Sequence, residues 1–437
     1  MFLPEYVHTC IETLEHQGFL CYAVGGCVRD SLLGLTPSDY DLCTDASPEE
    51  ICSAFSHCRL VLAGEKHGTV GVITTGGVVE ITTFRTEGDY TDSRHPGWVA
   101  FVKTIEEDLS RRDFTVNAMA YSPTRGFADP WGGREDLKNH ILRAVGDPTV
   151  RFQEDALRIL RGVRFAVRYQ LQPEQATKDA MFAQASLLDR IAKERIFEEM
   201  CKTLPLMSAE DLLEFAPVIC QVIPELAPTV GFDQRNFHHA YDLYTHIAHV
   251  TAATDSHLAL RWAALLHDIG KIKTFTVDEL GQGHFYGHGA VSAQMADDIL
   301  HRLKAPTALR EDVVFLIENH MHLPDPNRKF LRRRLSSWGA DRLKLLLKLQ
   351  RADLCCKGVD SDPGLFDETE ALLEKVLAEN SCLTLGDLAI NGHDLLALGM
   401  GGKDIGICLN KLLAQVVEET LPNEKTALLA AAKEVGK

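Results

Sequence analysis

The sequence predicts an α+β protein, in which a mixed β-sheet with helices comes first and an all-helical part follows. Up to about residue 140, short strands alternate with helical segments, whereas from about residue 150 the apolar residues recur at helical spacing. Two glycines, Gly25-Gly26, lie between a predicted strand and a predicted helix, as in many phosphate-binding turns. These observations place a candidate ligand site in the N-terminal sheet.

The predicted elements of the N-terminal part follow from apolar spacing and turn residues. The first helix carries Val7, Ile11 and Leu14 on one face, and Gly18 can end it. The stretch Ser47-Pro48-Glu49-Glu50 is a capping box that opens a later helix. In order, we predict a helix over 4–16, a strand over 19–24, a short helix over 28–33, a helix from 48, and a hairpin of strands 69–74 and 78–84.

The turn at Gly25-Gly26 is suited to hold a phosphate group. Glycine lets a backbone turn approach a ligand closely, and the helix that follows offers free N–H groups and a positive dipole. Arg29 adds a guanidinium that suits phosphate oxygens. Alone, such a turn is more often ordinary, but its position before Asp39 favours a nucleotide site.

Two carboxylates follow this turn in Asp39-Tyr40-Asp41. On a strand, residues two apart project from the same face, so both carboxylates can hold Mg²⁺. Glu80 lies between apolar residues of the second hairpin strand, where an unpartnered carboxylate is costly. It is a candidate third acid, and a solvent-facing Glu on a half-exposed strand is the alternative.

A second candidate site lies in the arginine-rich segment 154–165. If this segment is one helix, Asp155, Arg158, Arg161 and Arg164 wind slowly around it at intervals of three residues. Asp155 and Arg158 could form an i,i+3 salt bridge, or both could present their polar edges to a nucleobase. An ion-paired, solvated helix face is the structural alternative.

Histidines and aspartates form a third constellation in the helical part. His267-Asp268 follows an apolar helix over 258–266, and His246, His288, His320 and Asp353 lie elsewhere in the same region. Imidazole and carboxylate ligands together suit a transition metal. With eighteen histidines in the chain, a chance cluster is the alternative.

Length and composition narrow the class of protein. The 437 residues allow roughly three domains, and 45% hydrophobic with 24% charged residues is typical of globular proteins. A net charge of −17 argues against a uniformly basic, nucleic-acid-coating surface but permits a local basic groove. Twelve scattered cysteines without a CxxC pair, no leader peptide and no long apolar run predict a cytoplasmic protein without a membrane segment.

Several of these motifs, in this order, resemble one family. The chain is similar to the bacterial class II tRNA nucleotidyltransferases, the CCA-adding enzymes, which are related to bacterial poly(A) polymerases. The resemblance covers some two hundred residues through Gly25 to Asp30, Asp39 to Asp41, Arg111 to Ala120, Asp129 to Gly133, the arginine-rich segment, and Arg190 to Met200.

The resemblance implies roles for single residues. Asp39 and Asp41 would bind Mg²⁺ as the catalytic carboxylates, with Glu80 as the candidate third acid. The nucleotide would be bound by two groups of residues. Gly26, Arg29, Arg112 and Asn117 would contact its triphosphate and ribose, whereas Asp155 and Arg158 would recognise the base of CTP or ATP, supported by Arg161 and Arg164. A loop over 85–96 resembles the one needed for A addition, which argues against an enzyme that adds only C.

The histidine-rich region resembles an HD domain, a metal-dependent phosphohydrolase fold. His246, His267, Asp268 and Asp353 match its four ligand positions, and His288 and His320 match the additional histidines of two-metal versions. The resemblance implies either a metal site, with phosphatase or cyclic phosphodiesterase activity, or an inherited helical frame that only supports tRNA.

The complete interpretation has four segments and one leading function. The segments are a nucleotidyltransferase head over 1–140, a helical neck over 141–205, a helical body with the HD domain over 206–355, and a helical tail over 356–437 that binds tRNA. The expected activity is the addition of C, C and A to tRNA from CTP and ATP. Poly(A) polymerase activity, an enzyme that adds only A, an HD phosphohydrolase with an RNA-binding head, and an RNA-binding adaptor are the alternatives. The oligomeric state is left open.

Overall fold

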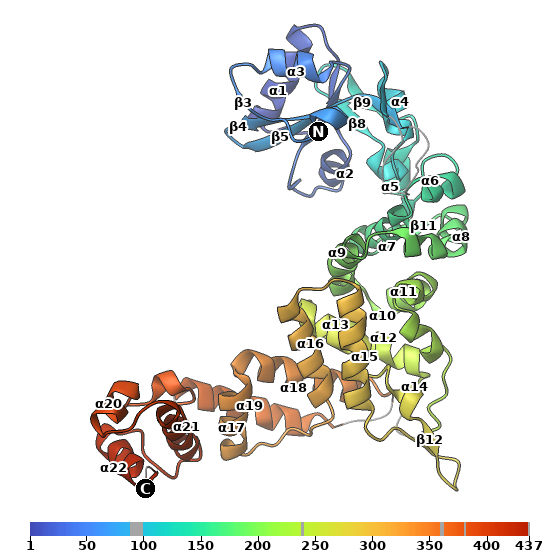
Figure 1. The fold of residues 1–437 in the computed structure, drawn as a ribbon. Helices are drawn as coiled ribbons and strands as arrows, with labels where there is room; N and C mark the ends of the chain where they lie inside the picture. Colours follow the sequence, from blue (N-terminus) through green and yellow to red (C-terminus); the bar gives the residue numbers. More distant parts are fainter. Residues whose placement is uncertain (88–98, 237–239, 359–361, 380–381, 436–437) are drawn as a thin grey trace. The chain divides into compact units, whose positions relative to one another are not determined.

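A computed structural model describes all residues except 88–98, 237–239, 359–361, 380–381 and 436–437 (Figure 1). The chain forms two compact units. The first contains residues 1–207 and 214–224, and the second contains residues 208–213 and 225–437. This division is coarser than the four predicted segments, which remain a prediction.

A seven-stranded mixed sheet organises the N-terminal unit, and its strand order is β3-β4-β5-β2-β1-β8-β9. Only β2 and β5 run parallel, and the other described pairs in this sheet are antiparallel. The strands are β1 Cys21–Val24, β2 Asp41–Thr44, β3 Arg59–Val61, β4 Thr69–Thr74, β5 Gly77–Thr83, β8 Ala120–Ser122 and β9 Gly126–Ala128. The predicted α+β fold class with a mixed sheet is therefore confirmed.

The predicted local elements agree closely with the structure. The helices of the sheet region are α1 Glu5–His16, α2 Gly26–Leu32, α3 Pro48–Ala54, α4 Ile105–Ser110 and α5 Gly133–Lys138. Ser47 and Glu50 form the predicted capping box of α3, and β4 pairs with β5 as the predicted hairpin. A second ribbon pairs β6 Arg85–Glu87 with β7 Val99–Phe101. The predicted loop over 85–96 falls largely outside the described residues.

The arginine-rich segment is not one helix, and this prediction is wrong. Helix α6 Pro148–Glu154 ends at Asp155, whose backbone is extended with φ −137° and ψ 103°. Helix α7 Leu157–Tyr169 starts two residues later, and the Asp155 side chain accepts a hydrogen bond from the Leu157 N–H at 3.0 Å. A side chain that bonds a nearby N–H competes with helix continuation, which accounts for the break.

The remaining helices of this unit follow α7 in the chain. They are α8 Gln175–Ala183, η3 Ala185–Arg190, α9 Lys193–Thr203, η4 Leu204–Leu206 and α11 Ala216–Val222, with a short parallel pair of β10 Ile141–Leu142 and β11 Gln172–Pro173. Leu157, Leu160 and Val163 of α7 are buried. α7 packs against α9.

The second unit is built around an apolar helix, α13 Leu258–Leu266. Eight of its nine residues, Ala259 to Leu266, are buried, which is typical of a helix covered on all sides. It packs against α12 Leu243–Ala253, α15 His288–Arg302, α16 Thr307–Asn319 and α18 Ala340–Cys355 (Figure 1). His267 follows directly at its C-terminal end, so the packing of α13 positions the histidine cluster.

Short elements complete this unit. They are α10 Ala209–Glu214, which begins in it, η5 Pro224–Thr229, α14 Lys271–Thr274, the hairpin of β12 Thr276–Val277 and β13 Gly283–His284, α17 Arg328–Trp338, α19 Gly364–Ala378, η6 Leu385–Asp387, α20 Gly392–Ala397, α21 Lys403–Val417 and α22 Lys425–Val435. The last three helices share an apolar core that includes Leu395, Leu412 and Leu428.

Helix α17 is rich in arginines, and acidic residues of the tail form ion pairs with several of them. Arg328 contacts Glu379 and Glu419, and Arg333 contacts Glu418 at 2.9 Å. Arg332 is buried and donates to the carbonyls of Val416 and Val417. These arginines therefore attach the helices of the tail to α17.

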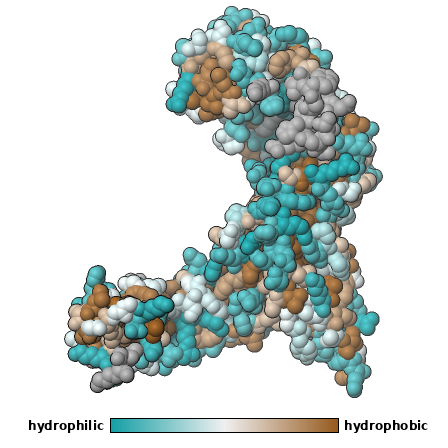
Figure 2. All heavy atoms as spheres, in the orientation of Figure 1, coloured by the Kyte–Doolittle hydropathy of each residue, from teal (hydrophilic) through white to brown (hydrophobic). Residues whose placement is uncertain are grey.

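The surface and the cysteines bear on the class of protein. Figure 2 shows an apolar patch on the N-terminal unit near β3 and β4, where Val61, Leu62 and Ile73 are exposed. Within the described residues, no helix combines the length and apolar character that crossing a bilayer requires. All twelve cysteines are free thiols.

Candidate functional site

The turn at Gly25 is shaped by a close contact with Arg112. Gly25 has φ +77°, and a Cβ at this position would lie 2.8 Å from Arg112 Nη1. The Gly25 carbonyl accepts hydrogen bonds from the N–H groups of Val28 and Arg29 at 3.2 and 3.1 Å. The positive φ therefore favours glycine here, and the turn brings the Arg112 guanidinium against the start of α2.

Arg29 faces the interior instead of the open side of this turn. Its guanidinium donates to the Asp30 carboxylate, to the Asn117 amide oxygen and to the Tyr169 hydroxyl, which lies 2.6 Å from Nη2. It also stacks over the Tyr169 ring at 4.2 Å. Only 6% of Arg29 is exposed. In this structure Arg29 therefore links α2 to the C-terminal end of α7, and its role at the triphosphate remains a prediction.

Asp41 and Glu80 are direct neighbours across the only parallel pair described in the sheet. The register pairs Asp41 of β2 with Glu80 of β5, so their side chains leave the same face. Partial desolvation, then the charges of Asp39 and Glu80, raise the pKa of Asp41 to about 6, against a smaller opposing effect of Arg112. Three carboxylates thus repel one another at the end of β2.

Such repulsion fits a cation site. A divalent ion would neutralise the charges that raise the Asp41 pKa. Within the described part of the chain, Asp39, Asp41 and Glu80 do not form a group whose oxygens all lie within 4.8 Å of one another. Mg²⁺ needs only one or two protein carboxylates and completes its shell with water and substrate phosphates, so a pair of these three residues could serve it.

Asp108 is a site residue that the sequence analysis did not identify. It is fully buried and contacts Arg111 at 2.9 Å and Arg112 at 3.3 Å. Burial raises its pKa, but these two arginines outweigh burial and hold the pKa below its usual value. Its position three and four residues before two arginines on a helix could have predicted the contact. Asp108 aims Arg112 toward Gly25 and Asp41.

Asp113 joins η2 Thr115–Asn117 to α7. Its carboxylate accepts hydrogen bonds from Asn117 Nδ2 at 3.0 Å and from Arg161 Nε and Nη2 at 2.8 and 2.6 Å. Burial raises its pKa, but Arg161 and Asn117 outweigh burial, so the pKa lies well below its usual range. Asn117, the predicted ribose contact, is thereby held in place.

The two residues predicted to recognise the base have separate partners in this structure. Asp155 contacts Arg195 at 3.3 Å, whereas Arg158 contacts Glu154 at 2.6 Å and donates to the Arg111 carbonyl at 3.0 Å. The suggested Asp155–Arg158 salt bridge is therefore not formed. Arg164 contacts Glu199 on α9 at 2.7 Å.

The second unit brings four imidazoles and two carboxylates together. Ligand atoms of His246, His267, Asp268 and Asp353 lie within 4.8 Å of one another, and Asp268 forms a second such group with His288 and His320. Asp268 Oδ2 lies 3.4 Å from His246 Nε2 and 3.2 Å from His267 Nε2, and Asp268 Oδ1 lies 3.2 Å from His288 Nε2. Asp268 thus bridges the two groups.

Contacts of the second ring nitrogen with backbone carbonyls orient all four imidazoles. In each ring Nδ1 lies within hydrogen-bond distance of a backbone carbonyl, which leaves Nε2 as the metal-binding atom. The carbonyls belong to Cys356, Ala264, Phe285 and Ile317 for His246, His267, His288 and His320 respectively. His267 Nε2 is buried, and Asp268 Oδ2, although 3.2 Å away, lies outside hydrogen-bond geometry, so this nitrogen has no hydrogen bond among the described residues. This donor set fits one or two transition metal ions.

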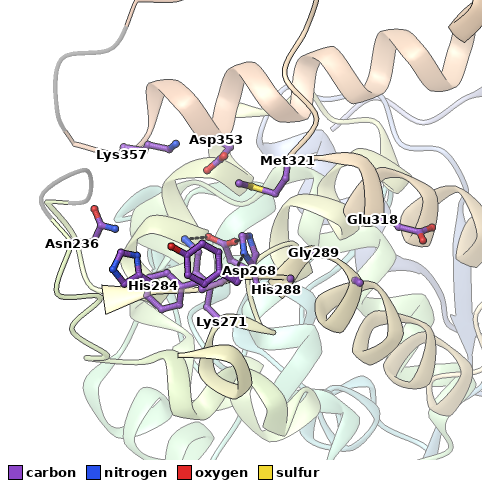
Figure 3. A pocket seen from close by; sticks show the side chains of 14 residues that line it. Asn236, Asp268, Lys271, His284, His288, Gly289, Glu318, Met321, Asp353 and Lys357 are labelled. Carbon is purple, nitrogen blue, oxygen red and sulfur yellow. Dashed lines mark hydrogen bonds and ion pairs between the residues drawn. The ribbon is translucent and has the colours of Figure 1, made fainter. Parts of the chain in front are cut away.

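A pocket of about 450 Å³ opens onto this cluster. Figure 3 shows Asp268, Lys271 and His288 together near its centre, His284 on one side, and Asp353 and Lys357 across from them. Lys271 is buried, and its Nζ lies 2.7 Å from Asp268 Oδ2. Candidate metal ligands and lysine side chains therefore line the same pocket.

Three family models match the chain in this order. Residues 21–143 match the poly A polymerase head domain, residues 170–227 match the probable RNA and SrmB-binding site of polymerase A, and residues 237–357 match the HD domain. The first match contains Asp41 and Asp113, and the third contains the histidine cluster. These matches and the mixed sheet define the class of protein, a nucleotidyltransferase.

Full-length relatives define the family within that class. The CCA-adding enzyme of Latilactobacillus sakei is 34% identical over 99% of both chains, and that of Geobacillus kaustophilus is 31% identical over 96% of this chain and 94% of the relative. The crystal structure of the Bacillus stearothermophilus CCA-adding enzyme in complex with CTP is similar with a TM-score of 0.74 and 28% identity, covering 100% of this chain and 98% of that one. The chain belongs to the CCA-adding enzyme family.

The raised pKa of Asp41 predicts how the Mg²⁺ requirement depends on pH. Because the carboxyl must lose its proton to bind the ion, the Mg²⁺ concentration for half-maximal nucleotide incorporation should rise as pH falls through about 6. An ordinary Asp would cause this rise only near pH 4. Glu80→Gln removes one of the repelling charges and should shift the rise to lower pH. Initial rates between pH 5.5 and 8 measure both effects, and identical profiles for the two proteins would contradict the assignment.

Proposed function

We propose that this protein completes the 3′ end of tRNA by adding C, C and A from CTP and ATP, releasing pyrophosphate, without a nucleic-acid template. The observation that carries the proposal is the position of Asp41, beside Glu80 and within the electrostatic reach of Arg112. A metal-binding carboxylate and a phosphate-binding cation are the two parts that nucleotidyl transfer requires.

In this proposal Asp39 and Asp41 hold Mg²⁺, which lowers the pKa of the tRNA 3′-hydroxyl and neutralises charge at the α-phosphate. Arg112, aimed by Asp108, binds the triphosphate at the Gly25-Gly26 turn. Asn117, held by Asp113, contacts the ribose. Because these side chains are fixed before the nucleotide binds, positioning supplies most of the rate enhancement.

Selection of the base is proposed for Asp155 and Arg158. The Asp155 carboxylate lies two residues before α7 and forms an ion pair with Arg195 at 3.3 Å. It can therefore exchange this partner for an amino group of cytosine or adenine, which both bases carry. Contacts with Glu154 and with the Arg111 carbonyl hold the Arg158 guanidinium in one orientation, so the N–H groups that these contacts leave over could donate to a base in a fixed direction.

The partners of the reaction are proposed from the relatives. One similar structure is that of the Bacillus stearothermophilus enzyme with CTP, and another is described as the Thermotoga maritima enzyme complexed with tRNA. The tail over 356–437 is a candidate tRNA contact, although the arginines of α17 are engaged with it internally. We place the reaction in the cytoplasm, where tRNA and reduced thiols coexist.

The nucleotide-incorporation pattern tests the proposal. A tRNA that lacks CCA should gain two C residues with CTP alone and one further A when ATP is added. Asp41→Asn should lower both additions by at least about a hundredfold, because it removes a metal ligand from the step. Incorporation of A without C would support the poly(A) polymerase or A-adding alternatives instead, and failure to add any C would contradict the proposal.

A second activity, hydrolysis of a phosphoester, is proposed for the histidine cluster. The observation that favours it is the intact set of four oriented imidazoles and two carboxylates at the pocket. When ions are bound there, they supply a water of lowered pKa. Water would add to phosphorus as the P–O ester bond breaks, and the leaving oxygen would gain a proton. Lys271 is placed to hold a phosphate oxygen.

Paired variants separate the two activities. Asp268→Asn should abolish phosphoester hydrolysis and bound transition metal, measured by elemental analysis, while leaving CCA addition within about twofold, because Asp268 lies in the other compact unit. Asp41→Asn should have the opposite pattern. Metal retention with full hydrolysis in Asp268→Asn would contradict the assigned centre.

A further inference from the structure

An exposed aromatic ring, that of Tyr286, lies at the pocket beside the histidine cluster, directly after the hairpin of β12 and β13. Tyr286 lines the pocket, yet 80% of it is exposed. Large aromatic side chains normally gain their stabilisation from burial, so a ring left in water at a pocket mouth is available to a ligand.

The Tyr286 ring is held by a stack. It lies parallel to the His284 ring, with an interplanar angle of 7° and a centroid distance of 5.4 Å. His284 is fixed in turn, because its Nε2 lies 2.9 Å from Asp278 Oδ2 on the same hairpin. Two stacked rings with one anchored by a carboxylate form a rigid, planar platform.

The hairpin itself is anchored to the unit. Phe285 stacks on Phe275 at 5.5 Å, and Phe275 packs against Phe232 at 5.1 Å. A Cβ at Gly283 would lie 2.2 Å from the Gln234 carbonyl oxygen, so the strand is pressed against the chain at this point. Phe285 thus turns inward and the next residue, Tyr286, turns outward.

The platform lies close to the candidate metal ligands. Only Gly287 separates Tyr286 from His288, and a span of two residues reaches at most about 7 Å between Cα atoms. Gly287 has φ +76°, which makes the turn into α15 that brings His288 to Asp268. Lys271 and Lys357 line the same pocket (Figure 3). A planar group on Tyr286 and a phosphate at the cluster would therefore belong to one small molecule or one chain end.

We propose that Tyr286 and His284 form a base-stacking subsite, so that the histidine cluster acts on phosphoesters of nucleosides in preference to esters without a base. The proposal rests on the hydrolytic activity proposed above, and it adds the selection of substrate. Stacking on an aromatic ring suits any nucleobase, because every base has a π-face. The subsite thus selects for a base but discriminates little between bases.

Kinetics on matched substrates test the selection. The metal-loaded full chain is assayed with the adenosine 2′-, 3′-, 5′- and 2′,3′-cyclic phosphates, and with ribose 5-phosphate and glycerol 2-phosphate. Tyr286→Leu should raise KM for the adenosine esters about tenfold with kcat nearly unchanged, and leave the base-less esters unaffected. Tyr286→Trp should restore the low KM. Leu280→Ala, at the 92% exposed tip of the same hairpin, is the control that should change neither.

A binding measurement without metal keeps the proposal independent of hydrolysis. The fluorescence of 2-aminopurine riboside monophosphate should be quenched by the metal-free chain, and Tyr286→Leu should lose a part of this quenching that Leu280→Ala retains. If no ester of either kind is hydrolysed, the proposed hydrolase fails, and the quenching alone decides the subsite. Equal quenching by Tyr286→Leu and the wild type would overturn the proposed subsite. An equal rise in KM for esters with and without a base would overturn it as well. A short RNA with a 3′-phosphate, compared with the mononucleotides, shows whether the base comes from a chain end or a free nucleotide.

Discussion

The buried carboxylate of Asp113 is the interaction on which the nucleotide site depends. It lies between η2 and α7, and it accepts hydrogen bonds from Asn117 on one side and Arg161 on the other. A buried charge that loses its partner is strongly destabilising, so this arrangement holds the two parts in one register. Arg29 reinforces it, since the same guanidinium reaches Asn117 and Tyr169. The Gly25-Gly26 turn and the helix that carries Arg158 therefore act as one body.

The two candidate sites differ in how many ligands the protein itself could supply to a metal ion. At the start of β2, the charges of Asp39 and Glu80 help to raise the pKa of Asp41, so this end of the strand suits a cation. In the second unit, four imidazoles are oriented by backbone carbonyls around Asp268, so most of a metal's ligands come from the protein. The first arrangement suits an ion that arrives with a nucleotide, and the second suits an ion that stays bound.

Features set by local sequence were predicted well, and those set by distant partners were not. The Gly25 turn, the capping box at Ser47 and the hairpin of β4 and β5 depend on neighbouring residues, and the structure contains them. The break at Asp155 was missed, because spacings of three residues look the same whether or not the helix continues. The inward position of Arg29 depends on Tyr169, 140 residues later, and the neutralised α17 depends on acids of the tail. No local pattern contains that information.

Asp113 and Arg161 act as a single unit that positions α7, the helix that carries Arg158, and a double-mutant cycle tests this most directly. The measured quantity is kcat/KM for CTP, and its ratio to that for UTP, on a tRNA lacking CCA, in Asp113→Asn, Arg161→Gln and the double variant. We predict that each single change lowers kcat/KM and the ratio, and that the double variant is no worse than the more affected single one, because the pair is already broken. Losses that multiply in the double variant, or an unchanged CTP-to-UTP ratio in all three proteins, would contradict the account.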